Sequence, residues 1–422
     1  PSLETKLETA PINQVTVPTR WEHVEPGPVG EYLEVIDIDP ASGCLYAPVD
    51  LNHPHVLAQN GLPPSEGNPQ FHQQMVYAVA MNTINRFELA LGRPIFWSSI
   101  RPWLGAKSPE TDYYTPEAKT LIDEAQAWER SLTRVQRVHL RDRYVQRLRI
   151  YPHALRDTNA YYSPDKRALL FGYFPASDDD VGTHYPGGTV FTCLSQDIIT
   201  HEMTHALLDG MHPYFNEPTN ADVWAFHEAF ADIMALFQHF TFPDVLRHQI
   251  AHTRGDLQTG NLLGELAQQF GQTTTGRSAL RSYLGEPNAK GEWERTKPQP
   301  DALRTAQQPH ERGKILVAAV FDAFLNLYDY RVADLIRIST GGSGVLPVGR
   351  IHPDLVNRLA TEAASAAEEI LRICIRALDY VPPIDITFGE FLRALVTADY
   401  DLAPTERRNR IAFIDAFRSW GI

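Results

Sequence analysis

The sequence predicts an α+β protein with a β-rich N-terminal half and an all-helical C-terminal half. Short alternating runs bounded by Gly, Pro and Asp turns dominate up to residue 194, whereas later apolar residues recur at helical spacing. A helix that carries two histidines lies at the junction. We therefore expect an N-terminal extension over residues 1–64, a β-rich lobe over 65–194, and the histidine helix with a helical lobe over 195–422.

Composition and charge exclude several classes of protein. The chain is 43% hydrophobic and 21% charged, which suits a globular fold with a large core. Its 52 acidic and 38 basic residues give a net charge of -14, which argues against a nucleic-acid or anionic-membrane partner. No apolar run is long enough to span a bilayer, and no leader is visible at the start. The compartment, cytoplasmic or secreted after removal of an unseen leader, and the oligomeric state stay open.

The cysteine pattern predicts buried thiols. Cys44, Cys193 and Cys374 are odd in number and far apart, so the sequence implies neither a disulfide framework nor a cysteine-rich metal cluster.

The N-terminal half alternates strands and turns around one long helix. Residues 34–38 and 44–49 predict a hairpin within the extension, which we expect to lie on the body of the protein. A helix over 69–91 is predicted because Pro69 suits a first turn and Gly92 a C-terminal stop. The remaining expectations are an inserted loop and helical piece over 103–133, strands within 134–150, a hairpin of 158–162 with 168–174, and a strand over 189–193.

From residue 195 onward the periodicity is helical. Ser195 offers an N-cap hydroxyl, Asp197 places negative charge in the first turn, and Gly210 is expected to stop the histidine helix. Further helices are predicted over 221–240, 315–328, 354–378, 388–399 and 406–420.

The histidine helix contains the motif His201-Glu202-Met203-Thr204-His205. Two histidines four residues apart lie on nearly the same helical face, so both imidazoles can bind one metal ion. Glu202 lies on the neighbouring stripe, close enough to take a proton from a metal-bound water. A zinc site needs a third ligand, for which Asp209, His212 and Glu228 are candidates.

Glu228 is the favoured third ligand. A zinc pattern that continues with a glycine and a third histidine is excluded, because those positions are Leu208 and Met211. Glu228 and Asp232 are one turn apart in an apolar helical segment, where an unpaired carboxylate would be costly. Asp232 would then accept the ring N–H of a ligating histidine. Three protein ligands leave a fourth position for water, which is the arrangement of a hydrolytic zinc site.

The order HEMTHALLDG and then HEAFAD resembles thermolysin and its relatives, over residues 65–422. The resemblance implies a thermolysin-like two-lobe metallopeptidase, with the zinc helix between a β-rich and a helical lobe. It also implies that His310, in PHERGKILVAAVF, stabilises an oxyanion and that Asn159 and Ala160 belong to an edge strand that holds the peptide. Arg281, in Leu280-Arg281-Ser282, would contact a substrate carbonyl.

The sequence also departs from this family. The segment between His205 and Glu228 is longer, so the tyrosine that assists the oxyanion has Tyr214 as its candidate. The region after the glutamate helix lacks the carboxylates of the double calcium site, although Asp197 keeps one position, so we expect one zinc ion and no calcium pair. An acidic partner for His310 stays unassigned, with Asp301 nine residues away.

The resulting expectation is a zinc endopeptidase that cleaves peptide or protein substrates through a zinc-activated water and the general base Glu202. Two alternatives remain open. One is a catalytically silent zinc-fold binding protein whose cleft is blocked by residues 1–64 or by the loop after Gly210. The other is an aminopeptidase, which is disfavoured because no acidic motif near Asn159 could capture a substrate amine.

Overall fold

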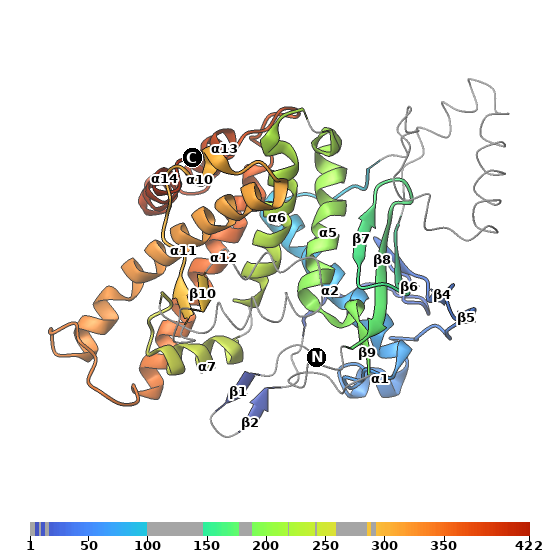
Figure 1. Ribbon diagram of the computed structural model, residues 1–422. Coiled ribbons are helices and arrows are strands. Elements are labelled where there is room, and N and C mark those ends of the chain that lie inside the picture. The colour runs from blue at the N-terminus through green and yellow to red at the C-terminus, as the bar shows by residue number, and fades with distance from the viewer. Residues whose placement is uncertain are drawn as a thin grey trace.

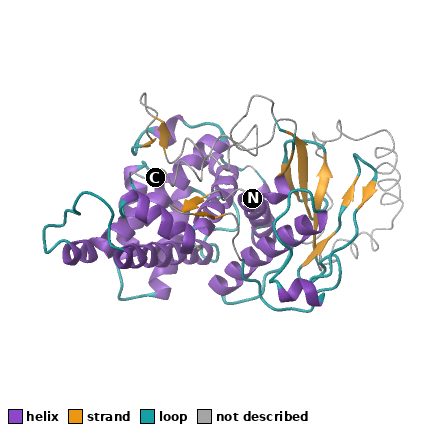
Figure 2. Ribbon diagram, turned by 90° about the horizontal axis from the view of Figure 1, so that it is seen from below, coloured by secondary structure: helices purple, strands orange, loops and turns teal. Residues whose placement is uncertain are grey.

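The computed structural model describes residues 5–7, 10–12, 17–98, 147–176, 188–217, 219–240, 243–258, 285–287 and 293–422. The described chain is a mixed α/β structure, with the largest sheet on one side and most helices on the other (Figures 1 and 2). The inserted piece predicted over 103–133 and the segment around Arg281 lie outside the described residues.

The largest described sheet contains five strands in a mixed arrangement. Strand β6 pairs in parallel with both β3 and β8, whereas β7 and β9 both run antiparallel to β8. Leu33 of β3 is 0% exposed, so residues of the predicted extension form a buried strand of this sheet instead of lying on its surface. The strands are β3 (Leu33–Val35), β6 (Leu148–Leu155), β7 (Ala160–Ser163), β8 (Ala168–Pro175) and β9 (Thr189–Phe191).

The predicted hairpin is confirmed as β7 and β8. Ala160 pairs with Phe171 and Ser163 with Ala168, while β9 pairs with the later residues of β8, Tyr173 to Pro175. Within the described sheet β7 pairs with β8 alone and therefore has an edge that no strand covers. That strand contacts the histidine helix.

Helix α2 (Pro69–Leu91) has the predicted bounds. The Asn68 side chain caps it by accepting from the Gln70 N–H at 3.1 Å, and Gly92 ends it in the left-handed region at φ +69°. Helix α2 packs between the sheet and the histidine helix, as Figure 1 shows.

The histidine helix is α5 (Gln196–Met211), and its ends differ from the prediction. Ser195 occupies the N-cap position, but its hydroxyl makes no capping hydrogen bond. Gly210 does not stop the helix, which continues to Met211. A Cβ at Gly210 would lie 2.2 Å from the Phe96 carbonyl oxygen, so glycine is needed there for the close approach of another chain segment.

The C-terminal half is mainly helical, and the five helices predicted after α5 are present. The expectation of an all-helical half is wrong, because β10 (Gly285–Pro287) pairs with β11 (Trp293–Arg295). The helix expected over 315–328 extends further at both ends, as α11. The helices are α6 (Ala221–His239), α7 (Pro243–Thr253), α10 (Ala302–Thr305), α11 (Pro309–Ser339), α12 (Pro353–Ala377), α13 (Phe388–Leu402) and α14 (Arg408–Ser419).

The smaller elements surround this framework. The hairpin predicted from residues 34–38 and 44–49 is present in part, because Ile38–Asp39 pairs with Cys44–Leu45 while residues 34 and 35 belong to β3 and pair with β6. These elements are β1 (Thr5–Leu7), β2 (Ala10–Ile12), β4 (Ile38–Asp39), β5 (Cys44–Leu45), α1 (Pro54–Ala58), η2 (Thr192–Leu194) and η3 (Pro213–Asn216).

Helix α6 lies at the centre of the helical core. It is buried on nearly all sides, against α5 on one side and α11 on another. Phe226 and Phe230 pack on Phe391 of α13 with ring centroids 4.9 and 6.1 Å apart. This packing fixes α6 relative to α13.

Two of the three cysteines are buried. Cys193 and Cys374 are buried, as predicted, but Cys44 is exposed because it lies in the short β5 hairpin at the surface. Among the described helices, none combines the length and apolar character needed to cross a bilayer.

Candidate metal centre

The side-by-side packing of α5 and α6 brings the three predicted metal ligands together. His201 Nε2 and His205 Nε2 are 3.0 Å apart. Glu228 Oε2 lies 3.5 Å from His201 Nε2, and Glu228 Oε1 lies 3.8 Å from His205 Nε2. Four ligands arranged tetrahedrally around zinc at about 2.1 Å would be separated by about 3.4 Å. The donor types and their spacing therefore fit a zinc ion.

Asp232 is placed to orient His201. Its Oδ1 lies 2.9 Å from His201 Nδ1, on the side of the ring opposite the ligand nitrogen. The negative charge of this carboxylate favours the proton at Nδ1, which leaves the Nε2 lone pair for a metal ion. Asp232 is thus adjacent to one of the two predicted ligand histidines.

His227 is a neighbour of the centre that the sequence analysis missed. His227 Nδ1 lies 2.7 Å from His205 Nδ1, and the two rings stack with centroids 4.7 Å apart. Burial is the main cause that lowers the pKa of His227 to about 3, and the nearby His205 is the second. The His227 ring is therefore neutral. A neutral His227 can accept the His205 Nδ1 proton, which leaves His205 Nε2 for the metal. The sequence offered a signal, since His227 directly precedes Glu228.

Glu202 connects α5 to the edge strand β7. The backbone N–H of Tyr162 donates to Glu202 Oε2 at 2.9 Å, and Glu202 is 1% exposed. That N–H points away from β8, from the edge that no described strand covers. The carboxylate is thereby held between the ligand histidines on its own helix and the strand predicted to bind a peptide.

The other two candidates for a third ligand are engaged elsewhere. Asp209 accepts from the Tyr162 hydroxyl at 2.7 Å and from the Asn216 amide at 2.6 Å. His212 Nε2 lies 2.8 Å from the Leu378 carbonyl oxygen. Geometry thus favours Glu228 over both.

His310 approaches the centre from α11. It is the second residue of that helix, which begins earlier than the predicted residue 315, and its Nδ1 lies 3.7 Å from Glu228 Oε2. Its side chain is 58% exposed, in contrast with the buried His201. His310 therefore lies on the solvent side of the ligand cluster. The sequence left open whether Asp301 is the acidic partner of His310. In the structure Asp301 Oδ1 lies 3.2 Å from Arg304 Nη1.

Two residues fix the start of α11 against α6. A Cβ at Gly313 would lie 2.9 Å from the Ala225 carbonyl oxygen, so glycine allows close contact between the helices. Arg312 pairs with Asp222 in the first turn of α6 and donates to the Leu303 carbonyl oxygen at 2.8 Å. These contacts hold His310 beside Glu228.

Three further residues singled out from the sequence lie on other parts of the described chain. Tyr214 lies on η3 and is 46% exposed. Asn159 Oδ1 accepts from the Ala160 N–H at 3.0 Å, beside the start of β7. Asp197 pairs with His239 at the end of α6. The roles of Tyr214, Asn159 and Ala160 stay predictions, and Arg281 lies outside the described residues.

Comparison with protein-family models and with curated proteins finds no match to this chain. The resemblance to thermolysin therefore rests on the residues of this sequence.

Proposed function

We propose that this chain is a zinc-dependent endopeptidase, with its metal centre between a sheet lobe and a helical lobe, as in thermolysin. The observation that carries the proposal is the convergence of His201, His205 and Glu228 from two helices, with Glu202 beside them. Two histidines and a glutamate are a ligand set of catalytic zinc sites that leave one position open.

The surrounding residues prepare these ligands for a metal ion. Asp232 and His227 each lie at the Nδ1 of one ligand histidine, so both Nε2 atoms can present lone pairs to the same point. Zinc bound there would lower the pKa of a bound water to about 7 and polarise a carbonyl group.

Glu202 and His310 have complementary roles in this proposal. Glu202, on the ligand side of α5, accepts a proton from the attacking water and passes it to the leaving amine. The Tyr162 N–H holds the Glu202 carboxylate in position. His310, on the solvent side of Glu228, donates a hydrogen bond to the oxygen on which negative charge develops.

Strand β7 is the proposed substrate platform. A peptide would bind in extended form along its uncovered edge, next to Glu202. The Ala160 N–H at this edge is engaged by the Asn159 side chain, so this amide would turn from Ala160 to the substrate backbone on binding.

The decisive test is Glu202→Gln. Glutamine keeps an oxygen for the Tyr162 N–H but cannot accept a proton as a carboxylate does, so we expect unchanged zinc content and a cleavage rate lower by about 10² to 10⁴. The matched control is Glu311→Gln, which changes an exposed carboxylate near His310 and should cleave like the wild type. Cleavage by Glu202→Gln at the wild-type rate would refute the proposed base.

A second candidate is a zinc-binding protein without turnover. It is favoured by the burial of Glu202, which is 1% exposed, and by its hydrogen bond to β7, which would keep substrate from the base. Full zinc occupancy together with no cleavage of a diverse peptide mixture by the wild type would support this candidate over the endopeptidase.

A further inference from the structure

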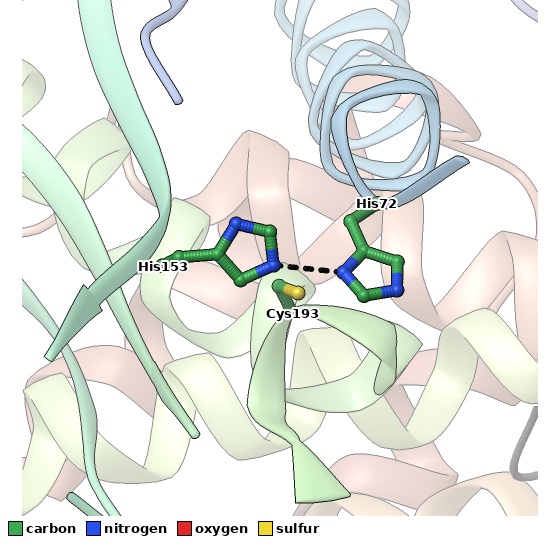
Figure 3. Close-up of side chains that lie close together, drawn as sticks. All are labelled: His72, His153 and Cys193. Carbon is green, nitrogen blue, oxygen red and sulfur yellow. Dashed lines mark hydrogen bonds between the residues drawn. The ribbon is translucent and has the colours of Figure 1, made fainter. Parts of the chain in front are cut away.

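A second cluster of metal-binding side chains lies in the sheet half of the protein. It joins His72 of α2, His153 of β6 and Cys193 of η2, all at most 2% exposed. The possible ligand atoms lie within 4.8 Å of one another, and Figure 3 shows the sulfur beside the two facing rings. These residues share no ligand with the centre on α5 and α6.

Hydrogen bonds on the far sides of the two rings fix where their protons lie. His72 Nε2 is 2.9 Å from the Glu66 carbonyl oxygen, which can only accept, so the proton is at Nε2. His153 Nδ1 is 2.6 Å from Asp37 Oδ1, and the second oxygen of Asp37 accepts from the Gln73 amide. With the ring proton of His153 directed at this carboxylate, His72 Nδ1 and His153 Nε2 both present lone pairs.

These two lone pairs face each other at 2.8 Å. Such a contact requires positive charge between the rings, either a proton that makes one ring an imidazolium or a metal ion. A proton would satisfy the two nitrogens and leave Cys193 without a role, whereas a metal ion would use all three groups. Imidazole nitrogen and thiolate sulfur are preferred ligands of zinc. Asp37 and the Glu66 carbonyl are then the outer hydrogen-bond acceptors that ligating histidines commonly have.

We propose that His72, His153 and Cys193 form a second zinc site, buried in the sheet half of the protein. Its ligands come from a helix, a strand and the turn η2, which ends at Leu194, just before α5 begins at Gln196. Zinc bound there joins α2 and β6 to the start of the helix that carries His201 and His205. Structural metal binding contributes directly to folding free energy. This site is independent of whether the chain hydrolyses peptides.

Cobalt substitution distinguishes the two centres. Protein produced in cobalt-supplemented medium should contain two metal equivalents and show sulfur-to-cobalt charge-transfer absorption, because a thiolate ligand is present at the Cys193 site alone of the two. Cys193→Ser should lose this absorption and one equivalent. The matched controls Cys374→Ser, also buried, and Cys44→Ser should keep both. His205→Ala should lose the other equivalent and keep the absorption.

X-ray absorption of the zinc-loaded wild type gives a second readout that needs no variant. A sulfur ligand at about 2.3 Å from zinc is expected. One metal equivalent, no charge-transfer absorption and no zinc–sulfur distance in the wild type would overturn the proposal and leave the imidazolium pair as the explanation of the short contact.

Discussion

Asp232 provides a quantitative test of how the zinc ligands are oriented. Its carboxylate lies 2.9 Å from Nδ1 of His201, whose side chain is 2% exposed. Metal binding at Nε2 requires the proton at Nδ1, so Asp232→Ala removes this acceptor in the metal-bound form. Loss of an acceptor for a buried donor costs about 1–3 kcal/mol. We therefore expect zinc affinity to fall about 10- to 100-fold, or about 1.4 to 2.8 kcal/mol.

Asp232→Asn is the matched variant, because its amide oxygen can still accept from His201 but carries no charge. Zinc dissociation constants measured by competition with a chromogenic chelator should rank wild type tightest, Asp232→Asn next and Asp232→Ala weakest. Circular dichroism of the three metal-free proteins controls for folding. An Asp232→Ala protein that is folded and binds zinc within twofold of the wild type would show that this contact does not orient the ligand.

Three further predictions follow from the helix packing around the centre. His310→Ala should leave zinc content unchanged and lower the rate of peptide cleavage by about 10² to 10³, measured at saturating substrate. Gly313→Ala should force α11 away from the Ala225 carbonyl oxygen. We expect the unfolding free energy measured by denaturant titration to fall by about 1–3 kcal/mol, and cleavage to slow because His310 is displaced. A wild-type unfolding free energy together with a wild-type cleavage rate would contradict this close packing. Burial lowers the pKa of His212 in the folded state, so the unfolded chain takes up its proton first as pH falls below about 6.5, and stability is lost there. His212→Gln, which can still donate to the Leu378 carbonyl oxygen, should flatten the fall in unfolding free energy between pH 7 and 5, and an unchanged slope would argue against this residue.

Elements specified by neighbouring residues were predictable from sequence. Helix α2 begins and ends where Pro69 and Gly92 indicate, because a fixed φ and a left-handed residue act locally. The position of Asp232 was also predictable, since helical spacing and the cost of an unpaired buried carboxylate together define its face.

Features that depend on distant segments were not predictable in this way. The pairing of β3 with β6 joins segments separated by more than a hundred residues, and no local pattern encodes it. Gly210 was misread as a helix stop because the Phe96 carbonyl that requires it lies elsewhere in the chain.

The same limit applies to the missed histidines and cysteine. The position of His227 directly before Glu228 placed it near the centre, but its contact with His205 depends on how α5 packs on α6. His72, His153 and Cys193 have no common motif, and folding alone brings them together.

The most direct test of the central claim is cleavage of a defined peptide mixture by zinc-loaded wild-type protein in ¹⁸O-labelled water, with products sequenced by mass spectrometry. The proposed endopeptidase predicts internal cuts with ¹⁸O in each new carboxyl group, loss of cleavage after chelation, and recovery when zinc is returned. Absence of cleavage by protein with zinc bound at His201, His205 and Glu228 would contradict the claim.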